Sequence, residues 1–165
     1  LHRLGLPPAF GLFHQVDIPA GKADFKVTDE FVLPCDVELV GAGAHAHYLG
    51  KALSMTCTTP DKKEHKLFAI LDWDFNWQGQ YLFKEFVRLS KGTVLRAEVV
   101  WDNSKENVRN PSSPPVRVRW GEASGDEMGS VGLTMVAADE KDSDALKQAI
   151  RRHTIETILR SRTRG

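Results

Sequence analysis

Short apolar segments follow one another along most of this chain, and several alternate between apolar and polar side chains. The clearest example is residues 116–120, which read Val-Arg-Val-Arg-Trp. Successive side chains of a strand face opposite sides of a sheet, so this alternation predicts strands with one buried face. The predicted strands cover residues 16–18, 25–27, 31–33, 37–40, 53–58, 66–71, 81–87, 94–101, 116–120 and 131–137.

Glycine, proline and asparagine separate these segments, at 19–21, 60–61, 91–92, 102–104 and 110–115. Between the predicted strands, the sequence shows no helical periodicity. Regular short strands with such punctuation predict an all-β fold, an antiparallel, jelly-roll-like β-sandwich, over residues 16–138.

The two ends of the chain differ from this domain. Residues 1–15 contain two adjacent prolines and apolar residues without a period, which predicts an irregular lead-in. Residues 139–165 begin acidic and then place apolar side chains at helical spacing, which predicts a helical tail with a basic second half. Such a helix packs on the sandwich, links to a following domain or binds a partner. The first two are favoured, because a single basic amphipathic helix in a neutral protein is usually a solvated face.

Composition narrows the function classes. At 165 residues the chain suits one domain with a sizeable core. Lys and Arg number 22, the same as Asp and Glu, so no global field attracts nucleic acid or an anionic membrane. No apolar run approaches the ~20 residues of a membrane-spanning helix. The chain begins at Leu1, without an initiator Met or a signal peptide, and we therefore expect a piece of a longer or matured protein.

Two cysteines, Cys35 and Cys57, do not make a disulfide framework or a zinc site. They fit two small buried thiols at least as well as one bridge, and they do not decide the compartment.

The first candidate for chemistry is a pair of histidines, His45 and His47, that follows the apolar run 37–40. Residues two apart on a strand share a face, so the two imidazoles lie side by side and leave room for a third metal ligand from elsewhere. The alternative is a pair of ordinary polar residues on a half-exposed face, since most histidines bind no metal.

The second candidate is Met128, which follows a polar Gly/Ser turn at the mouth of the strand predicted at 131–137. A thioether with two imidazoles forms a soft, mixed site that selects copper, Cu(I) especially, over zinc or magnesium. Taken by itself, Met128 is better described as a gap-filling core residue.

Together, His45-Ala46-His47-Tyr48-Leu49-Gly50-Lys51 and Asp126-Glu127-Met128 resemble the catalytic C-terminal domain of the copper type II, ascorbate-dependent monooxygenases. That family includes peptidylglycine α-hydroxylating and dopamine β-monooxygenases. Segments 18–21, 72–78, 102–104, 107–111 and 120–121 are similar to its bacterial members in particular. The resemblance covers about residues 16–138 and does not include the tail.

This resemblance implies that His45, His47 and Met128 bind one copper ion, at which O2 is activated to hydroxylate an aliphatic C–H bond. It also implies ascorbate or another reductant as the electron donor, a small-molecule or peptide substrate, and a periplasmic or extracellular location. The family's second copper, held by three histidines in a preceding domain, has no counterpart here. We therefore expect weak or no coupled hydroxylation in isolation, and an electron-donating domain in the parent protein.

Three positions depart from the peptide-amidating members. Where those enzymes carry Arg, Asn and Tyr side chains that hold the substrate, the matching residues here are Gly43, Ser130 and Gly132. Their side chains make no such contacts, which argues against peptide amidation.

Two other functions stay open. A thioether–imidazole site also suits a non-catalytic module for copper storage, transfer or redox relay. A sandwich that binds glycans or proteins through the tryptophan-rich loop 73–80 is the third possibility. The preferred interpretation of that loop is structural, with both tryptophan rings packed onto the sandwich. Glu127, beside the candidate methionine, either supports a ligand imidazole or is simply exposed.

Overall fold

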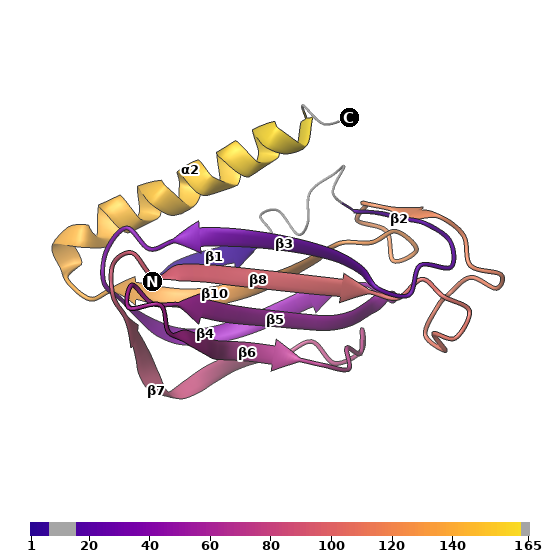
Figure 1. Cartoon of the computed structure of the whole chain (residues 1–165), viewed down its shortest axis with the longest axis horizontal. Helices are drawn as coiled ribbons and strands as arrows, with labels where there is room; N and C mark the ends of the chain where they lie inside the picture. Colours follow the sequence, from indigo (N-terminus) through magenta and orange to yellow (C-terminus); the bar gives the residue numbers. More distant parts are fainter. Residues whose placement is uncertain (7–15, 163–165) are drawn as a thin grey trace.

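The computed structural model describes residues 1–6 and 16–162, and its strands form a β-sandwich with one long C-terminal helix (Figure 1). This confirms the predicted all-β fold with a helical tail. The strands are β1 (His2–Leu6), β2 (Asp17–Ile18), β3 (Phe25–Val32), β4 (Val37–Ala46), β5 (Gly50–Thr58), β6 (Glu64–Ile70), β7 (Gln80–Leu89), β8 (Val94–Trp101), β9 (Val118–Arg119) and β10 (Gly129–Ala137). A short 3-10 helix, η1 (Glu140–Asp142), leads into α2 (Ser143–Arg162).

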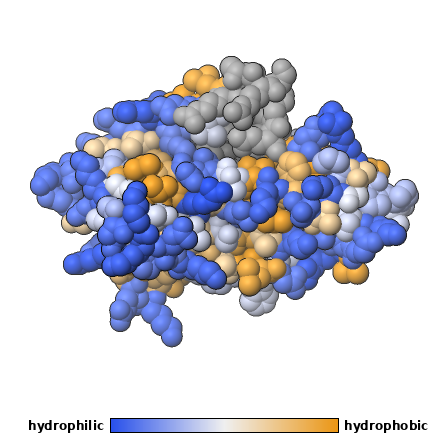
Figure 2. Space-filling model, in the orientation of Figure 1, coloured by the Kyte–Doolittle hydropathy of each residue, from blue (hydrophilic) through white to orange (hydrophobic). Residues whose placement is uncertain are grey.

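The two main layers are four-stranded sheets with the strand orders β1-β10-β4-β7 and β3-β8-β5-β6, and β2 pairs with β9 in a small third sheet. All of these strand pairs are antiparallel. The β3-β8-β5-β6 sheet faces the viewer in Figure 1, and its outer surface is mostly hydrophilic (Figure 2). Charged pairs such as Lys26 with Glu98, which join β3 to β8, contribute to that surface.

The core lies between the two sheets and follows from the alternation seen in the sequence. In β8 the inward-facing residues are Leu95, Ala97, Val99 and Trp101, all fully buried. Inward side chains of β10 meet them from the opposite sheet. Burying each large apolar side chain contributes roughly 1.5–3 kcal/mol, so this double layer provides most of the driving force for folding.

Strand β4 changes face along its length because it contains a bulge. Its pairing with both neighbours skips Val40, so the register moves directly from Leu39 to Gly41. Before the bulge the odd-numbered Val37 and Leu39 face the core, whereas after it the even-numbered Ala42, Ala44 and Ala46 do. An extra residue in one strand has this effect because side chains alternate with a period of two. The bulge therefore turns His45 to the outer face of the sheet.

Helix α2 runs along the side of the sandwich where β1 and β3 are the outermost strands (Figure 1). His2 Nε2 lies 2.8 Å from Ser143 Oγ, and His153 Nε2 lies 2.9 Å from Asp29 Oδ2. Leu146, a residue of α2, is fully buried. The tail thus packs on the sandwich and covers two sheet edges, which is one of the two interpretations favoured from sequence.

The predicted irregular lead-in is wrong for its first part. Residues 2–6 form β1, paired with β10 from His2↔Met135 to Leu6↔Val131. Among residues 2–5 of this strand, whose burial is described, Leu4 is the buried one, and a single buried position is too weak a pattern to predict a strand. The rest of the predicted lead-in, residues 7–15, lies outside the described residues.

Other strand boundaries also shift. The strands predicted at 25–27 and 31–33 are one strand, β3, because the polar residues between them continue the ladder with β8. Conversely, the strand predicted at 116–120 contracts to β9. The predicted strand at 94–101 is confirmed in full as β8.

Cys35 and Cys57 are both buried and form no disulfide with each other. Burial raises the pKa of both thiols, so they are structural and unreactive at neutral pH. In the described part of the chain, no helix combines the length and the apolar character needed to cross a membrane.

Candidate metal centre

The two histidines predicted as ligands lie together at the end of β4, on the outer face of its sheet. The centroids of the His45 and His47 rings are 5.3 Å apart, and the rings are nearly perpendicular. His45 is partly exposed, whereas His47 is 5% exposed. The bulge at Val40 is the backbone feature that places both rings outside the core.

Hydrogen bonds define which nitrogen of His47 carries the proton. Its Nδ1 lies 3.0 Å from the backbone oxygen of Asp126. A carbonyl oxygen only accepts, so Nδ1 must donate, and in the neutral ring Nε2 is then the unprotonated nitrogen. That nitrogen has the lone pair that a metal requires.

His45 has the same arrangement with a side-chain acceptor. Its Nδ1 lies 2.6 Å from Gln78 Oε1, while Gln78 Nε2 donates to the backbone oxygen of Phe75 at 2.8 Å. The second bond orients the amide so that its oxygen faces the imidazole, and Nδ1 of His45 therefore donates. Burial lowers the pKa of His45, an effect that the Gln78 bond opposes, so the ring is neutral at neutral pH.

The backbone of His47 is fixed on both sides. Trp73 Nε1 donates to the His47 carbonyl oxygen at 3.1 Å, and Gly50 N donates to the same oxygen at 3.2 Å. A methyl group on Gly50 would stand 2.5 Å from Trp73 Cδ1, so this glycine is what allows the indole to approach.

A buried carboxylate holds together the two segments that carry the candidate ligands. Glu127 is 1% exposed, and its Oε2 accepts from the backbone nitrogens of His47 at 3.1 Å and Met128 at 3.2 Å. The same oxygen accepts from Trp101 Nε1 at 2.8 Å, and Oε1 accepts from Leu49 N at 2.6 Å. Burial raises the pKa of Glu127 to about 7 against the opposing effect of these four donors. Of the two alternatives for this residue, exposure is wrong, and the carboxylate bonds the backbone N–H of His47 rather than its imidazole.

Met128 lies one residue before β10, next to the point where that strand meets β4. The register pairs Gly129 with Ala46 and Ser130 with His45, and Glu127 Oε2 accepts from the backbone nitrogens of both His47 and Met128, so the backbones of these residues lie close together. Met128 is 9% exposed. The structure thus brings all three predicted ligands to one corner of the β1-β10-β4-β7 sheet.

The loop before β7 contributes more to this corner than the sequence predicted. Only one of its two tryptophans packs onto the sandwich, because Trp73 is 1% exposed and Trp77 is 73% exposed. The expectation that both rings anchor the loop is therefore wrong for Trp77. Phe75 lies between the two tryptophans in the sequence. Its ring is nearly perpendicular to the His47 ring, at 5.9 Å between centroids, and closes that side of the corner.

Gln78 is the residue that sequence reasoning missed most clearly. An amide three residues before a predicted strand carries no signal of its own, and only the fold brings it to an imidazole 33 positions away. The available signal was that the loop combines aromatic and amide side chains, which is typical of a binding surface.

The remaining histidines are not part of this corner. His2 and His153 make the contacts with α2 and β3 described above, and His65 is exposed on β6. His14 lies outside the described residues. Within the described ranges, no group of three or more His, Cys, Asp or Glu side chains could hold a metal ion. The candidate set differs from such groups because its third donor is a thioether.

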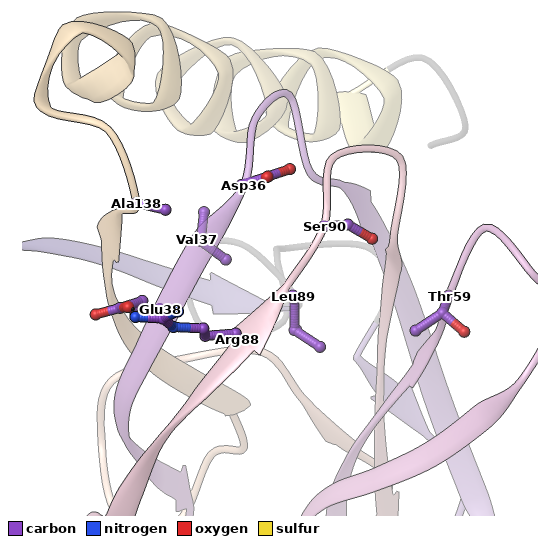
Figure 3. Close-up of a pocket in the computed structure, with 8 residues that line it drawn as sticks. All are labelled: Asp36, Val37, Glu38, Thr59, Arg88, Leu89, Ser90 and Ala138. Atoms are coloured by element: carbon purple, nitrogen blue, oxygen red, sulfur yellow. Dashed lines mark hydrogen bonds and ion pairs between the residues drawn. The ribbon is translucent and has the colours of Figure 1, made fainter.

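A hollow of about 440 Å³ lies at the opposite end of β4 from the histidines, where Val37 and Leu89 form part of its wall (Figure 3). Its cationic side chain, Arg88, is paired with Glu38 at 2.8 Å. Asp36 Oδ1 accepts from Lys91 N at 2.7 Å. Because these charged groups already have partners and none of the described lining residues is a histidine, the histidine corner is the better candidate site.

Comparisons with known proteins do not assign this chain to a group. No family model matches it, and no curated protein matches it either. The likeness to copper monooxygenases therefore depends on the quoted motifs and on the geometry of the corner.

Proposed function

We propose that this domain binds one copper ion through His45, His47 and Met128 and is the catalytic half of a monooxygenase. One observation carries the proposal: two adjacent imidazoles both have Nδ1 committed to an oxygen acceptor. Ligating histidines typically use their other ring N–H in this way, because the bond fixes the tautomer and the ring orientation.

The donor set fits copper better than other ions. Two imidazole nitrogens and one thioether sulfur make a soft site, and a thioether is a poor ligand for zinc, magnesium or calcium. Three protein ligands also leave a position for an exogenous molecule.

When bound, copper would supply activation of O2 for inserting one oxygen atom into an aliphatic C–H bond. The balanced reaction consumes the substrate, O2, two electrons and two protons, and yields the alcohol and water. Ascorbate or another reductant would supply the electrons.

The protein's own groups prepare the corner for this reaction. Glu127 fixes the backbones of His47 and Met128 through hydrogen bonds to the same carboxylate oxygen. Gln78 and the carbonyl of Asp126 hold the two rings. Ligands held by a rigid surrounding shell keep their geometry with little reorganisation.

The test is copper K-edge absorption and metal analysis of the reduced protein loaded with Cu(I). We expect one copper per chain, with nitrogen and sulfur scatterers. Met128→Leu conserves volume and should remove only the sulfur scatterer, whereas Met135→Leu, a buried control in β10, should retain it. Loss of copper in His47→Ala but not in His65→Ala would support the assignment. An unchanged metal content in His47→Ala would refute it.

Turnover is tested separately from binding. Consumption of O2 by the Cu(I) protein with ascorbate and a candidate substrate would favour the enzyme. Tight Cu(I) binding that is inert to O2 under these conditions would favour the alternative, a non-catalytic copper module.

A further inference from the structure

Among the described elements, the sandwich has one covered side and one open side. Helix α2 runs along the side where β1 and β3 are outermost, whereas β6 and β7 are the outermost strands on the opposite side (Figure 1). The rings of Phe68 in β6 and Tyr81 in β7 are 5.6 Å apart between centroids, so the two edges meet there. Open strand edges are common sites of association.

Large apolar side chains are exposed along this open side. They come from the end of β6, from the loop that follows it and from β7, and we call them the edge patch: Leu71, Trp77, Tyr81, Leu82 and Phe86. Leu82 is as much as 80% exposed. Apolar side chains gathered in this way are typical of an interaction surface, because burying them in a partner is favourable.

The edge patch extends from the loop before β7 into the strand itself. A Cβ on Gly79 would stand 3.0 Å from the Tyr81 ring, so this ring lies back over the loop that carries Trp77. The next residue, Leu82, has its Cδ2 3.3 Å from the place of a Cβ on Gly41 and therefore covers the outer face of β4. The patch thus joins the rim of one sheet to the outer surface of the other.

A partner would meet the side chains of β7 rather than its backbone ladder. The pairing of β7 with β4 moves from Leu82↔Gly41 directly to Val87↔Leu39, so residues 83–86 have no partner in β4 and form a wide bulge. Such a bulge blunts an edge against the addition of another strand. Association at this side therefore depends on packing and on surface charge.

The exposed area is large enough for a stable dimer. Large apolar side chains present roughly 150–250 Å² each, so the exposed parts of the edge patch provide roughly 500–800 Å² in one chain. Stable interfaces bury about 800 Å² on each partner once the surrounding polar atoms are included. Two copies that cover each other's patch reach that size.

The charges beside the patch suit a second copy of the same chain. Lys84 and Glu85 are adjacent in the β7 bulge, both are exposed, and neither has an ion-pair partner among the described residues. A two-fold axis at the bulge sets Lys84 of each copy against Glu85 of the other, which forms the same pair twice. Lys and Arg equal Asp and Glu in number, so two copies carry no net charge that drives them apart.

We propose that a second copy of this chain covers the edge patch, so that the protein is a two-fold symmetric dimer joined along β6 and β7. Trp77, Leu82 and Phe86 form the apolar centre of the interface, and Lys84 with Glu85 fixes its orientation. This proposal does not depend on copper binding or on turnover.

The first experiment measures the mass of the metal-free chain by sedimentation equilibrium over a concentration series. Interfaces of this size have dissociation constants from micromolar to picomolar, so we expect the mass of two chains at about 100 µM, falling towards that of one chain on dilution if the affinity is micromolar. The mass of one chain at every concentration would overturn the proposal, and so would a mass that keeps rising beyond two chains.

Variants locate the interface. Leu82→Glu should raise the dissociation constant about 100-fold or more, since the two-fold axis makes the substitution count twice. Val32→Glu is the matched control, because Val32 is an exposed valine of β3, at the other edge of its sheet from β6, and its dissociation constant should stay unchanged. Both positions are exposed, so both variants should keep the circular dichroism spectrum of the unmodified chain. Equal dimerisation of Leu82→Glu and the unmodified chain would refute the proposed interface.

A charge exchange tests the two-fold arrangement itself. Lys84→Glu and Glu85→Lys each place like charges together twice and should weaken dimerisation about three- to tenfold. The double variant restores opposite charges and should return the dissociation constant to within about twofold of the original. A double variant that dimerises as weakly as either single one would overturn the pairing of Lys84 with Glu85 across the axis.

Discussion

Gly129 offers a sharp test of how the core supports the candidate site. A Cβ at this position would stand 2.7 Å from Trp101 Cζ2 and 2.9 Å from Val99 Cγ1. Ordinary carbon–carbon contacts are roughly 3.5–4.0 Å, so Gly129→Ala creates an overlap of about 1 Å. Trp101 is fully buried and bonded to Glu127, so its ring has no open space into which to move.

The cost follows from these contacts. Overpacking of a close-packed core destabilises by about 1–3 kcal/mol, and displacing the indole also weakens a hydrogen bond to a carboxylate worth about 1.5–3 kcal/mol. We expect Gly129→Ala to lower the free energy of unfolding by about 2–4 kcal/mol. Gly132→Ala, in the same strand, has 3.8 Å of room and should change it by less than about 1 kcal/mol.

Urea unfolding of the metal-free proteins, followed by tryptophan fluorescence, measures both values. In thermal unfolding the difference should appear as a midpoint lower by roughly 5–12 °C for Gly129→Ala. Cu(I) affinity should fall as well, because Trp101 shares a carboxylate oxygen with His47 and Met128. Equal stability of the two alanine variants would show that the indole is not confined, and the reasoning about this core would fail.

Three further substitutions test separate parts of the corner. Gln78→Leu removes the acceptor for His45 Nδ1 and should weaken Cu(I) binding about 10- to 100-fold in a competition titration with a chromogenic chelator, with little change in stability; an unchanged affinity would contradict the role of Gln78. Glu127→Leu leaves four N–H donors without their acceptor, each costing about 1–3 kcal/mol, so we expect a chain that fails to fold cooperatively in urea titrations, and near-normal stability would contradict the network. Gly41→Ala places a Cβ 2.5 Å from the Tyr81 backbone oxygen, beside the β4 bulge, and should lower the free energy of unfolding by about 1–3 kcal/mol. Thermal unfolding measures this against Gly5→Ala, whose Cβ has no described atom within 4 Å.

Sequence patterns predicted the sandwich well because its core strands alternate. The strand predicted at 94–101 matches β8, whose inward residues follow a strict period of two. Strand β1 was missed because Leu4 is the one buried position among its residues 2–5, and β3 was divided because its central residues are polar. Those polar residues serve contacts made by distant segments, such as Asp29 with His153, which local patterns do not contain.

The sequence nominated the candidate ligands but not the residues that surround them. A strand with His45 and His47 on one face follows from their spacing, yet the sequence does not say which face. Extending the apolar run at Val37 and Leu39 with a period of two would point both rings into the core. The bulge at Val40 reverses this, and a bulge depends on pairing with two neighbouring strands.

The same bulge decides which residues of β4 face outward at the proposed metal site. Shifting the face of β4 by one residue turns Gly43 outward together with His45, while Ala42, Ala44 and Ala46 turn inward. Gly43 pairs with Gly132, and His45 pairs with Ser130. These two pairs therefore lie on neighbouring rows of one surface. Without the extra residue, the glycines would weaken the core and the histidines would be buried in it. A single extra residue in β4 therefore places the His45 imidazole on the solvent side of the sheet.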